Sequence, residues 1–502
     1  MSDLIIEKID SVTIKVRCER GIAKELSDFF TFKVPGYKFM PQYKNKMWDG
    51  TIKLYNIYEQ TIYRGLLNYI YKFAEDRSYN IQVANPEDFQ NENSIEKEET
   101  RKFVDSELQP IAGGEMIVSH EHQIEAITHA INNDRCLLLS PTASGKSLII
   151  YSLIRYYMDK LPKDKKILII VPTTSLVSQM YSDFAEYSQI DHTFDVEKET
   201  HIVFAGKDKT CKSCNIVIST WQSIYKLPKK YFDQYGAVFG DECHLFKSKS
   251  LTTLMTKLTD CPYRVGTTGT LDGTQTHKLV IEGLFGPVYD VVTTKELMDK
   301  DLLAQLEIDT IILKYGDEEK KEVRRAKYQD EMKWLITNKK RNHFITDMAV
   351  NLKGNTLILF QFVDEHGKVL HSMLKDKVHS NRKVFFVYGG TNVEVREEIR
   401  HIVEKNDDAI IVASYGTFST GISIRKLNNI IFASPSKSRV RVLQSIGRQL
   451  RKSKNKGTAK LYDIGDDLSW KSYKNHTLRH FSERIKIYKS EKFNYNPVVV
   501  RL

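Results

Sequence analysis

A loop of small and polar residues with one lysine could hold the phosphates of a nucleotide. An apolar run, 136–139, precedes the loop, and a run with helical spacing, 148–156, follows it. The loop consists of Ser140, Pro141, Thr142, Ala143, Ser144, Gly145, Lys146 and Ser147. Backbone N–H groups at the start of a helix can point at phosphate oxygens, with the lysine on the β- and γ-phosphates and the last serine on Mg²⁺. The usual first glycine is Ser140 here, so the strand–loop–helix setting carries the prediction of an ATP–Mg²⁺ site.

Two adjacent carboxylates supply a second part of such a site. Asp241 and Glu242 follow the apolar run 237–239, about 95 residues after Lys146. An acid at the end of a buried strand is where an enzyme with a P-loop anchors its Mg²⁺. We expect Asp241 to hold the ion through water and Glu242 to act as general base on the attacking water. Alone, the DECH segment could be a surface cluster or suggest zinc, but its spacing and strand setting favour the nucleotide.

Arginines late in the chain could stabilise the charge that develops on the γ-phosphate. The segment 444–451 reads QSIGRQLR and begins with Gln444. Arg448 and Arg451 are three residues apart and therefore lie on one face of a predicted helix. Arginine fingers raise rates by about 10³–10⁵ in other nucleotide hydrolases. A solvated basic helix is the alternative, and only the two earlier motifs make the catalytic interpretation preferable.

The elements that must position these motifs follow from the apolar runs. Short apolar runs alternate with amphipathic stretches from residue 108, pause near 290–305 and then resume. Such alternation predicts parallel sheets covered by helices, so we expect two α/β domains in tandem. The predicted strands are 136–139, 167–171, 216–218, 237–239, 357–360, 384–387, 410–412 and 430–432.

The N-terminal residues have the pattern of a small α+β domain. Residues 11–17 alternate as a strand does, 23–30 have helical spacing, and 48–54 indicate a turn into a strand. Residues 85–107 are polar and acidic with almost no hydrophobic periodicity, which predicts a linker or an exposed connection. The predicted domains, with the linker in the first, are 1–100, 101–300 and 301–502.

The composition fits a protein that binds nucleic acid. The 502 residues include 75 Lys and Arg against 64 Asp and Glu, a formal net charge of +11. This basic excess is moderate and is compatible with other partners as well. Six cysteines are few, and no apolar run approaches the ~20 residues that span a bilayer. With no pattern of a secretory signal at the start, we expect a cytoplasmic protein with no membrane partner.

The order and spacing of the three motifs resemble those of superfamily 2 helicases. The resemblance implies two RecA-like parallel-sheet lobes after the small α+β domain, with ATP bound in the cleft between the lobes. It places Gln123 on the adenine, and Gly421 where the second lobe contacts the nucleotide. It also implies that Thr268 and Thr270 couple hydrolysis to motion. The positions that would contact the nucleic-acid backbone are Thr173, Thr174, Thr220, Gly389, Gly390, Ser419 and Thr420.

Two positions depart from the helicase pattern. Gly269 stands where that family has alanine in its coupling segment. Ser423 stands where many members have an aspartate that contacts the nucleotide, so the resemblance implies no such contact at residue 423.

A closer resemblance, over nearly the whole chain, is to the UvsW DNA helicases of T-even phages. The similar segments are 29–56, 167–180, 291–299, 410–423 and 491–495. This resemblance implies an ATP-dependent 3′→5′ DNA helicase acting on R-loops, D-loops, stalled forks and Holliday junctions. It implies a part in recombination, repair and recombination-dependent replication in the host cytoplasm. The implied partners are branched or single-stranded DNA, RNA–DNA hybrids, and phage recombination or single-strand-binding proteins.

Two other functions remain open. A double-strand translocase, such as the motor of a restriction system, would carry the same motifs, although the chain shows no obvious nuclease motif. An ATP-gated binding or annealing module is less favoured, because a pure switch need not keep Glu242 and Arg451. RNA as the main substrate is supported only by motifs that the whole superfamily shares.

Two further patterns have a structural alternative. Cys211 and Cys214 have the spacing of metal ligands, but zinc usually needs a second ligand pair, so two ordinary cysteines are expected. Residues 471–501 mix basic residues with aromatic rings, which suits either single-strand stacking or packing on the second lobe. We expect the rings to pack and the charges to meet phosphate. The N-terminal domain poses the same question with Tyr37, Trp48, Lys33, Lys38, Lys44, Lys46 and Lys53.

Overall fold

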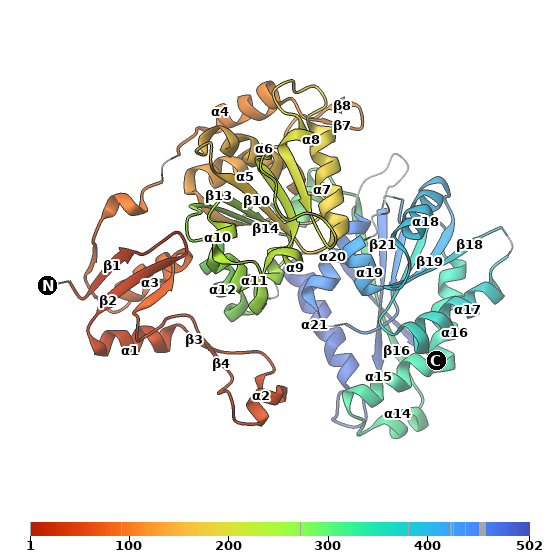
Figure 1. Ribbon diagram of the computed structural model, residues 1–502. Coiled ribbons are helices and arrows are strands. Elements are labelled where there is room, and N and C mark those ends of the chain that lie inside the picture. The colour runs from red at the N-terminus through yellow and green to blue at the C-terminus, as the bar shows by residue number, and fades with distance from the viewer. Residues whose placement is uncertain are drawn as a thin grey trace. The chain divides into compact units, whose positions relative to one another are not determined.

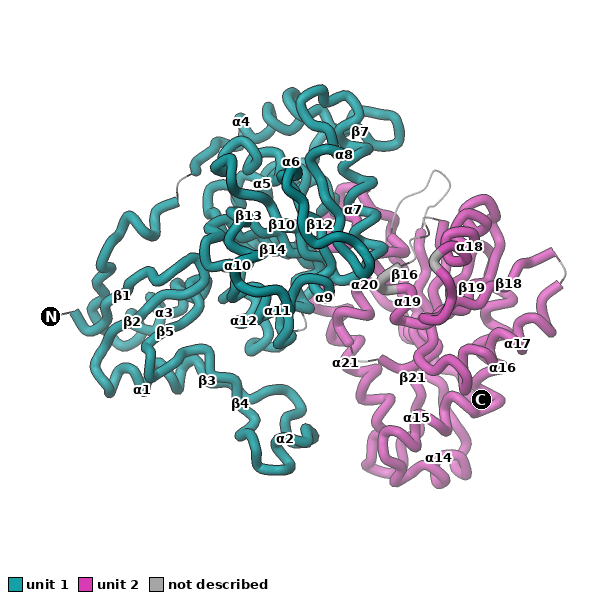
Figure 2. Tube along the Cα trace, in the orientation of Figure 1, with its two compact units in different colours: residues 1–140, 144–291 teal, residues 141–143, 292–502 magenta. Residues whose placement is uncertain are grey.

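The chain forms two units, each with its own seven-stranded sheet (Figures 1 and 2). The computed structural model describes residues 2–91, 93–271, 273–379, 381–421, 424, 426–436, 438–450 and 458–502. Unit 1 contains residues 1–140 and 144–291, and unit 2 contains residues 141–143 and 292–502. Within unit 1, residues 2–91 are called the N-terminal domain and the rest is called lobe 1. No helix among these residues is long and apolar enough to cross a membrane.

The N-terminal domain is built on a four-stranded sheet in the order β5-β2-β1-β6. The strands are β1 (Leu4–Lys8), β2 (Thr13–Cys18), β5 (Thr61–Tyr63) and β6 (Ile81–Val83). Alternate residues of β2, Ile14 and Val16, are fully buried, as the predicted strand alternation requires. They pack with residues of the helices α1 (Arg20–Phe29) and α3 (Leu67–Glu75).

Between α1 and β5 the chain leaves this sheet, and we call residues 31–53 the β3–β4 excursion. Its elements are β3 (Thr31–Lys33), η1 (Tyr37–Phe39), α2 (Pro41–Lys44) and β4 (Thr51–Lys53). The strands β3 and β4 pair antiparallel with each other only. In Figure 1 the excursion extends away from the four-stranded sheet, with α2 near its tip.

Lobe 1 contains a sheet whose neighbouring strands are all parallel, in the order β11-β12-β10-β13-β14-β9-β15. The strands are β9 (Arg135–Leu139), β10 (Lys166–Val171), β11 (Thr200–Val203), β12 (Ile216–Thr220), β13 (Tyr235–Gly240), β14 (Tyr263–Thr268) and β15 (Val288–Asp290). The longest helices are α5 (Glu121–Asn133), α6 (Lys146–Lys160), α7 (Thr174–Tyr187) and α12 (Gln275–Phe285). The four predicted strands of this lobe lie within β9, β10, β12 and β13 and are confirmed.

Strand β14 was not predicted, because its sequence has no apolar run. It reads YRVGTT, yet all six residues are buried. The guanidinium of Arg264 is fully buried and donates to the carbonyl oxygens of Met255, Leu258 and Leu284 at 2.7–3.0 Å. Burial of a charged group is tolerated where all its donors meet acceptors, and these acceptors come from other segments of the fold.

The predicted exposed connection over 85–107 is wrong for its second half. Residues 97–108 form α4 (Lys97–Lys102) and a π-helical stretch (Phe103–Leu108), and Thr100 and Val104 are fully buried there. Lys97 forms ion pairs with Glu121 and Glu125 of α5. The charges that suggested a solvated linker are therefore partly paired with the neighbouring helix.

The N-terminal domain packs directly on α12 of lobe 1. A Cβ atom on Gly65 would lie 2.0 Å from the carbonyl oxygen of Glu282. The Tyr69 hydroxyl donates to the Glu282 carboxylate at 2.8 Å, and Leu279 of α12 belongs to the core of the N-terminal domain. The backbone N–H of Ser11 donates to a lobe 1 carbonyl at 2.9 Å. The two parts of unit 1 therefore share backbone contacts and a core.

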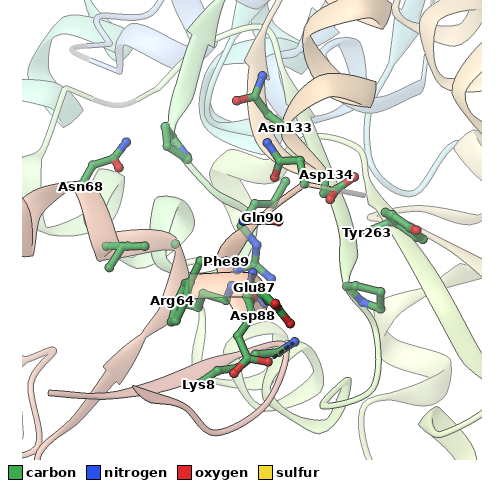
Figure 3. A pocket seen from close by; sticks show the side chains of 16 residues that line it. Lys8, Arg64, Asn68, Glu87, Asp88, Phe89, Gln90, Asn133, Asp134 and Tyr263 are labelled. Carbon is green, nitrogen blue, oxygen red and sulfur yellow. Dashed lines mark hydrogen bonds and ion pairs between the residues drawn. The ribbon is translucent and has the colours of Figure 1, made fainter. Parts of the chain in front are cut away.

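A pocket of about 350 Å³ lies on the same boundary (Figure 3). Arg64 and Asp88 line it from the N-terminal domain, and Asp134 and Tyr263 line it from lobe 1. Lys8 and Asp88 form an ion pair there at 3.7 Å. The lining carries both signs of charge, as expected for a boundary between two parts of one unit.

Unit 2 contains a second sheet with parallel neighbours, in the order β18-β19-β17-β20-β21-β16-β22. The strands are β16 (Gln305–Lys314), β17 (Thr356–Phe360), β18 (Lys383–Val387), β19 (Ala409–Ser414), β20 (Asn429–Phe432), β21 (Thr458–Asp467) and β22 (Tyr495–Arg501). The main helices are α15 (Tyr328–Thr337), α16 (Lys339–Asn351), α17 (Lys368–Lys377), α18 (Val393–Lys405), α19 (Tyr415–Gly421), α20 (Arg439–Gln449) and α21 (His476–Ser490). The four strands predicted for this domain lie within β17, β18, β19 and β20 and are confirmed.

The C-terminal segment packs on unit 2 through its aromatic rings. Strand β22 pairs in parallel with β16 at the end of the sheet, and Phe481, Tyr488 and Phe493 are buried. The expectation that the aromatic rings pack is confirmed for these three. Arg484 of the same segment is 1% exposed and pairs with the buried Asp463 of β21 at 2.7 Å, so this charge is structural.

We predict that Gly65→Ala weakens the docking of the N-terminal domain on lobe 1. The new methyl group would overlap a backbone carbonyl oxygen, and overpacking of this kind costs about 1–3 kcal/mol. Thermal unfolding and limited proteolysis at the boundary measure the effect. Gly21→Ala is the matched control, because a Cβ atom there meets nothing within 4 Å and the residue lies in α1. Equal stability of the two variants would contradict the prediction.

Candidate functional site

The predicted phosphate-binding loop connects β9 directly to α6, which begins at Lys146. Ala143 and Gly145 adopt left-handed backbone conformations, with φ of 68° and 85°. A Cβ atom on Gly145 would lie 2.0 Å from Nε2 of Gln123. The backbone angle therefore favours glycine at residue 145, and a larger residue would also have to displace the end of the Gln123 side chain.

Serine in place of the usual first glycine takes part in holding this loop. The Oγ atoms of Ser140 and Ser144 are 2.5 Å apart, and both side chains are buried. The backbone N–H of Ser140 donates to the carbonyl of Thr268 at 2.9 Å. Lys146 Nζ donates to the carbonyl of Ser140 at 3.2 Å, so the lysine lies over the loop.

Gln123 lies against the same loop from the first turn of α5. Its Nε2 donates to the carbonyl of Ser144 at 3.1 Å, and its Oε1 accepts the backbone N–H of His120 at 2.8 Å. His122 Nε2 lies 3.0 Å from the same Ser144 carbonyl. Two side chains from the start of α5 therefore meet one carbonyl of the loop.

The carboxylate of Asp241 is buried at the carboxyl end of β13. Its Oδ1 accepts the Thr267 hydroxyl at 2.9 Å and the backbone N–H of Glu242 at 2.9 Å. Burial raises the pKa of Asp241, the nearby charge of Glu242 raises it further, and Lys146 acts in the opposite direction. A buried acid held in this way favours a bound cation, because added positive charge would stabilise its ionised form.

A chain of polar contacts leads from Glu242 to the predicted coupling segment. Glu242 has left-handed backbone angles (φ 53°), which cost a non-glycine residue about 1–2 kcal/mol. His244 Nδ1 lies 3.2 Å from its carboxylate and 3.1 Å from Thr268 Oγ1. The Thr268 hydroxyl also donates to the carbonyl of Thr270 at 3.1 Å. The structure thus brings the predicted general base and the predicted coupling residues together.

Cys243, between the acids and this histidine, is a packing residue. It is fully buried, and burial raises the pKa of its thiol. A Cβ atom on Gly240 or Gly266 would lie 2.9 Å or 2.8 Å from its Sγ. In the part of the chain that the structure describes, no three metal-ligating side chains gather at one place.

The two segments of lobe 1 predicted to contact nucleic acid are neighbours. Val171 at the end of β10 pairs with Thr220 at the end of β12, so both segments leave the same edge of the sheet. Thr173 caps α7 through the N–H of Leu176 at 3.4 Å, and Thr174 is the first residue of that helix. Gln222 Nε2 donates to the carbonyl of Pro172 at 3.1 Å and connects the two segments.

In unit 2, the predicted residues lie on α20 and at the carboxyl ends of two paired strands. Gln444 and Arg448 are four residues apart on α20, and Arg448 lies over the Phe418 ring at 6.0 Å. Gly389 and Gly390 follow β18 and are exposed.

The structure describes only the backbone of several predicted residues of unit 2, and leaves others outside its described residues. The backbones of Ser419, Thr420 and Gly421 form the end of α19, which follows β19, the parallel neighbour of β18. The side chains of these three residues, and both Arg451 and Ser423, lie outside the described residues.

Three protein-family models match consecutive parts of the chain. "DNA helicase UvsW, N-terminal" matches residues 3–84, and "Type III restriction enzyme, res subunit" matches residues 116–273. "Helicase conserved C-terminal domain" matches residues 339–453. The three matches cover the N-terminal domain, most of lobe 1 and most of unit 2.

The chain is similar over its full length to the ATP-dependent DNA helicase uvsW of Enterobacteria phage T4. The two are 35% identical over 517 residues, which cover 100% of each chain. The chain belongs to the UvsW family. It is an ATP-dependent DNA helicase of superfamily 2, and DNA is its substrate.

The crystal structure of T4 UvsW has the same fold as this UvsW family member. It is 32% identical, covers 99% of both chains and has a TM-score of 0.52. The Type ISP restriction-modification enzyme LlaBIII bound to DNA has a TM-score of 0.56 at 16% identity. That match covers 78% of this chain and 32% of the enzyme, and it shows the fold alone. The predicted fold class, two RecA-like lobes after a small α+β domain, is confirmed.

Sequence reasoning missed three residues that hold this site together. Thr267 and His244 join the predicted acids to the predicted coupling segment, and His122 braces the predicted phosphate-binding loop. His244 carried a signal, as the last residue of DECH, but the sequence suggested only a zinc role for it. Thr267 and His122 gave no pattern, because their partners Asp241 and Ser144 are distant in sequence.

We predict that His244→Ala uncouples ATP hydrolysis from strand separation in this UvsW family member. The change removes the contacts between Glu242 and Thr268, and a lost buried hydrogen bond of about 1.5 kcal/mol corresponds to about a tenfold effect. The measurement is the number of base pairs separated per ATP hydrolysed, which should fall about tenfold more than the ATPase rate. His192→Ala, an exposed histidine of lobe 1, is the control. A proportional loss of both activities would contradict coupling through this side chain.

Proposed function

We propose that this helicase hydrolyses ATP–Mg²⁺ to move 3′→5′ on DNA and to unwind or branch-migrate R-loops, D-loops, forks and Holliday junctions. The observation that carries the proposal is the full-length similarity to T4 uvsW, combined with an ordered P-loop and acid pair in lobe 1. We assign it to recombination, repair and recombination-dependent replication in the host cytoplasm. The proposed domains are 1–100, 101–300 and 301–502.

Lobe 1 would supply most of the catalytic machinery. Lys146 would bind the β- and γ-phosphates and Ser147 the Mg²⁺ ion, with the backbone of Thr142, Ala143, Ser144 and Gly145 around the phosphates. Asp241 would hold the ion through water, and its burial beside Glu242 supports a cation there. Glu242 would take the proton of the attacking water. Gln123 would read the adenine once it leaves the Ser144 carbonyl.

Unit 2 would complete the site when ATP is bound. Gln444, Arg448 and Arg451 would reach the γ-phosphate, and Gly421 would contact the nucleotide. Arg448 and Gln444 share one face of α20, which allows both to meet the same ligand. Because the charge on the γ-phosphate grows in the transition state, arginines there stabilise it more than the ground state.

DNA would be held mainly through its phosphates. Thr268 and Thr270 would pass the state of the nucleotide to the strand-binding segments. The proposed phosphate contacts are Thr173, Thr174, Thr220, Gly389, Gly390, Ser419 and Thr420. Phosphate contacts fix position without reading sequence, which suits a motor that must pass over every sequence.

The energetics favour branched substrates. Separating a DNA duplex costs about 1.4 kcal/mol per base-pair step on average. Moving a branch point or the edge of an R-loop re-forms about one pair for each pair lost, so that exchange is nearly balanced. A motor of this kind would therefore migrate branches more readily than it strips long duplexes.

The β3–β4 excursion supports a DNA contact by the N-terminal domain. Phe39 is 80% exposed and Met47 is 79% exposed, which is unusual for large apolar side chains. The excursion also carries five lysines, namely Lys33, Lys38, Lys44, Lys46 and Lys53. Apolar and aromatic side chains among positive charges suit unpaired bases next to a phosphate backbone.

A translocase that does not separate strands is the second candidate. The fold match to a DNA-bound restriction-modification enzyme is compatible with it, but does not favour it over unwinding. Single-stranded DNA, RNA–DNA hybrids and phage recombination or single-strand-binding proteins are the proposed partners.

The first test measures ATPase rates without DNA, with linear duplex and with forked DNA, for the wild type and Lys146→Ala. We expect forked DNA to stimulate the wild type, and a loss of about 10²-fold or more in the variant, because a phosphate clamp is removed. A rate that DNA does not change would reduce the function to nucleotide binding.

A strand-displacement assay then distinguishes a helicase that separates strands from a translocase that does not. Fast fork or junction processing beside poor unwinding of long linear duplex supports branch migration, and the reverse result would overturn it.

We further predict that Phe39→Ala with Met47→Ala weakens the response to forked DNA. Stacking of one base contributes about 1–3 kcal/mol, so the concentration of fork that half-activates the ATPase should rise about tenfold. Tyr58→Ala is the matched control, because Tyr58 is 96% exposed in the same domain but lies outside the excursion. If both variants respond to forks as the wild type does, the excursion is not a DNA contact.

A further inference from the structure

Cys211 and Cys214 lie together in the loop between β11 and β12 of lobe 1. The Cys211 sulfur accepts the backbone N–H of Cys214 at 3.2 Å and lies 3.9 Å from the Ser213 hydroxyl. Cys211 is partly exposed, whereas Cys214 is 2% exposed and belongs to the core of the lobe. Lys166 donates its amine to the Cys211 carbonyl and anchors the turn to the start of β10. The pair therefore presents one accessible sulfur with a second sulfur behind it.

The surroundings of the two thiols shift their pKa values in opposite directions. Partial burial acts to raise the pKa of Cys211, but the donors of Cys214 and Ser213 outweigh it and hold that pKa below its ordinary value. Burial, together with the neighbouring sulfur, raises the pKa of Cys214 to about 12. A thiolate is the nucleophile in sulfur chemistry, so only Cys211 is prepared to attack.

The other four cysteines lack this arrangement. Burial raises the pKa of each of the thiols of Cys18, Cys136, Cys243 and Cys261. A structural zinc site needs four ligands, and no third metal-ligating side chain joins the pair among the described residues. The geometry is thus that of a dithiol rather than half of a zinc site.

We propose that Cys211 and Cys214 form a thiol–disulfide exchange site for small disulfides, with Cys211 as the attacking thiolate and Cys214 as the resolving thiol. In the first step the Cys211 thiolate bonds to one sulfur of the small disulfide. The disulfide bond breaks, and the other sulfur leaves as a thiolate that takes a proton from water. In the second step Cys214 loses its proton to solvent and attacks the Cys211 sulfur, which expels the second small thiol. Two protein thiols are oxidised to one disulfide, and one small disulfide is reduced to two thiols.

The test treats the full chain with oxidised glutathione and identifies the products by mass spectrometry after the free thiols are alkylated. The wild type should lose two hydrogens and yield a peptide with a disulfide between Cys211 and Cys214. Cys214→Ser should instead accumulate glutathione on Cys211, because the resolving thiol is gone. Cys211→Ser should carry no modification at either position. Its ATPase rate and circular dichroism, unchanged from the wild type, show that it is folded.

Cys18→Ser is the matched control and should behave as the wild type does. Cys18 is also partly exposed, but its thiol has a raised pKa. Alkylation of Cys211 by iodoacetamide at pH 7.5 should be at least about tenfold faster than that of Cys18, since the rate follows the thiolate fraction. Equal rates for the two cysteines would overturn the proposal. So would a wild type that stops at glutathione on Cys211, or one whose pair reacts only after a bound zinc ion is removed.

Discussion

Parallel hydrogen bonding among β13, β14 and β9 is the constraint on which the rest of the ATP site depends. The pairing sets Gly240 of β13 beside Gly266 of β14, and Thr268 of β14 beside Leu139 of β9. Carboxyl ends of parallel strands meet at one edge, so the P-loop, the acid pair and the coupling segment all leave the sheet there. The two glycines leave room for Cys243 beneath the acids. The carboxylate of Asp241 then takes its hydrogen bonds from residues that the sheet has already placed.

The same lobe connects this site to the N-terminal domain through continuous packing. Helix α12 begins a few residues after Thr270 and carries the contacts to Gly65 and Tyr69. Because a glycine faces a backbone carbonyl there, the boundary has little freedom to slide. The β3–β4 excursion therefore belongs to the same unit as the predicted acid pair of lobe 1.

In unit 2, buried ion pairs hold helices against the sheet. Asp463 and Asp466 lie on β21 and are fully buried, with Arg484 on one and Arg341 on the other. Removing one partner of such a pair leaves an uncompensated buried charge, which is strongly destabilising. The pairs fasten α16 and α21 to an inner strand of this sheet, and the predicted DNA and nucleotide contacts of unit 2 follow other strands of the same sheet. Arg341 and Arg484 add to the net positive charge of the chain but serve the fold rather than DNA.

The sequence by itself determined the family, the enzyme class and the main strands. The P-loop, acid pair and arginine segment are local patterns, and strands that are buried on both faces appear in the sequence as apolar runs. The eight predicted strands were all found, and the family was evident from its motifs. Only the tertiary structure decided the role of charged residues, because a charge is stable inside a protein only when distant acceptors meet it. The sequence did not predict that Arg264, in an unpredicted strand, and Lys97, in an unpredicted helix, are paired. Their partners lie in other elements of the fold. The link through His244 was likewise fixed only when β13 and β14 paired and brought Glu242 and Thr268 within reach of one imidazole ring.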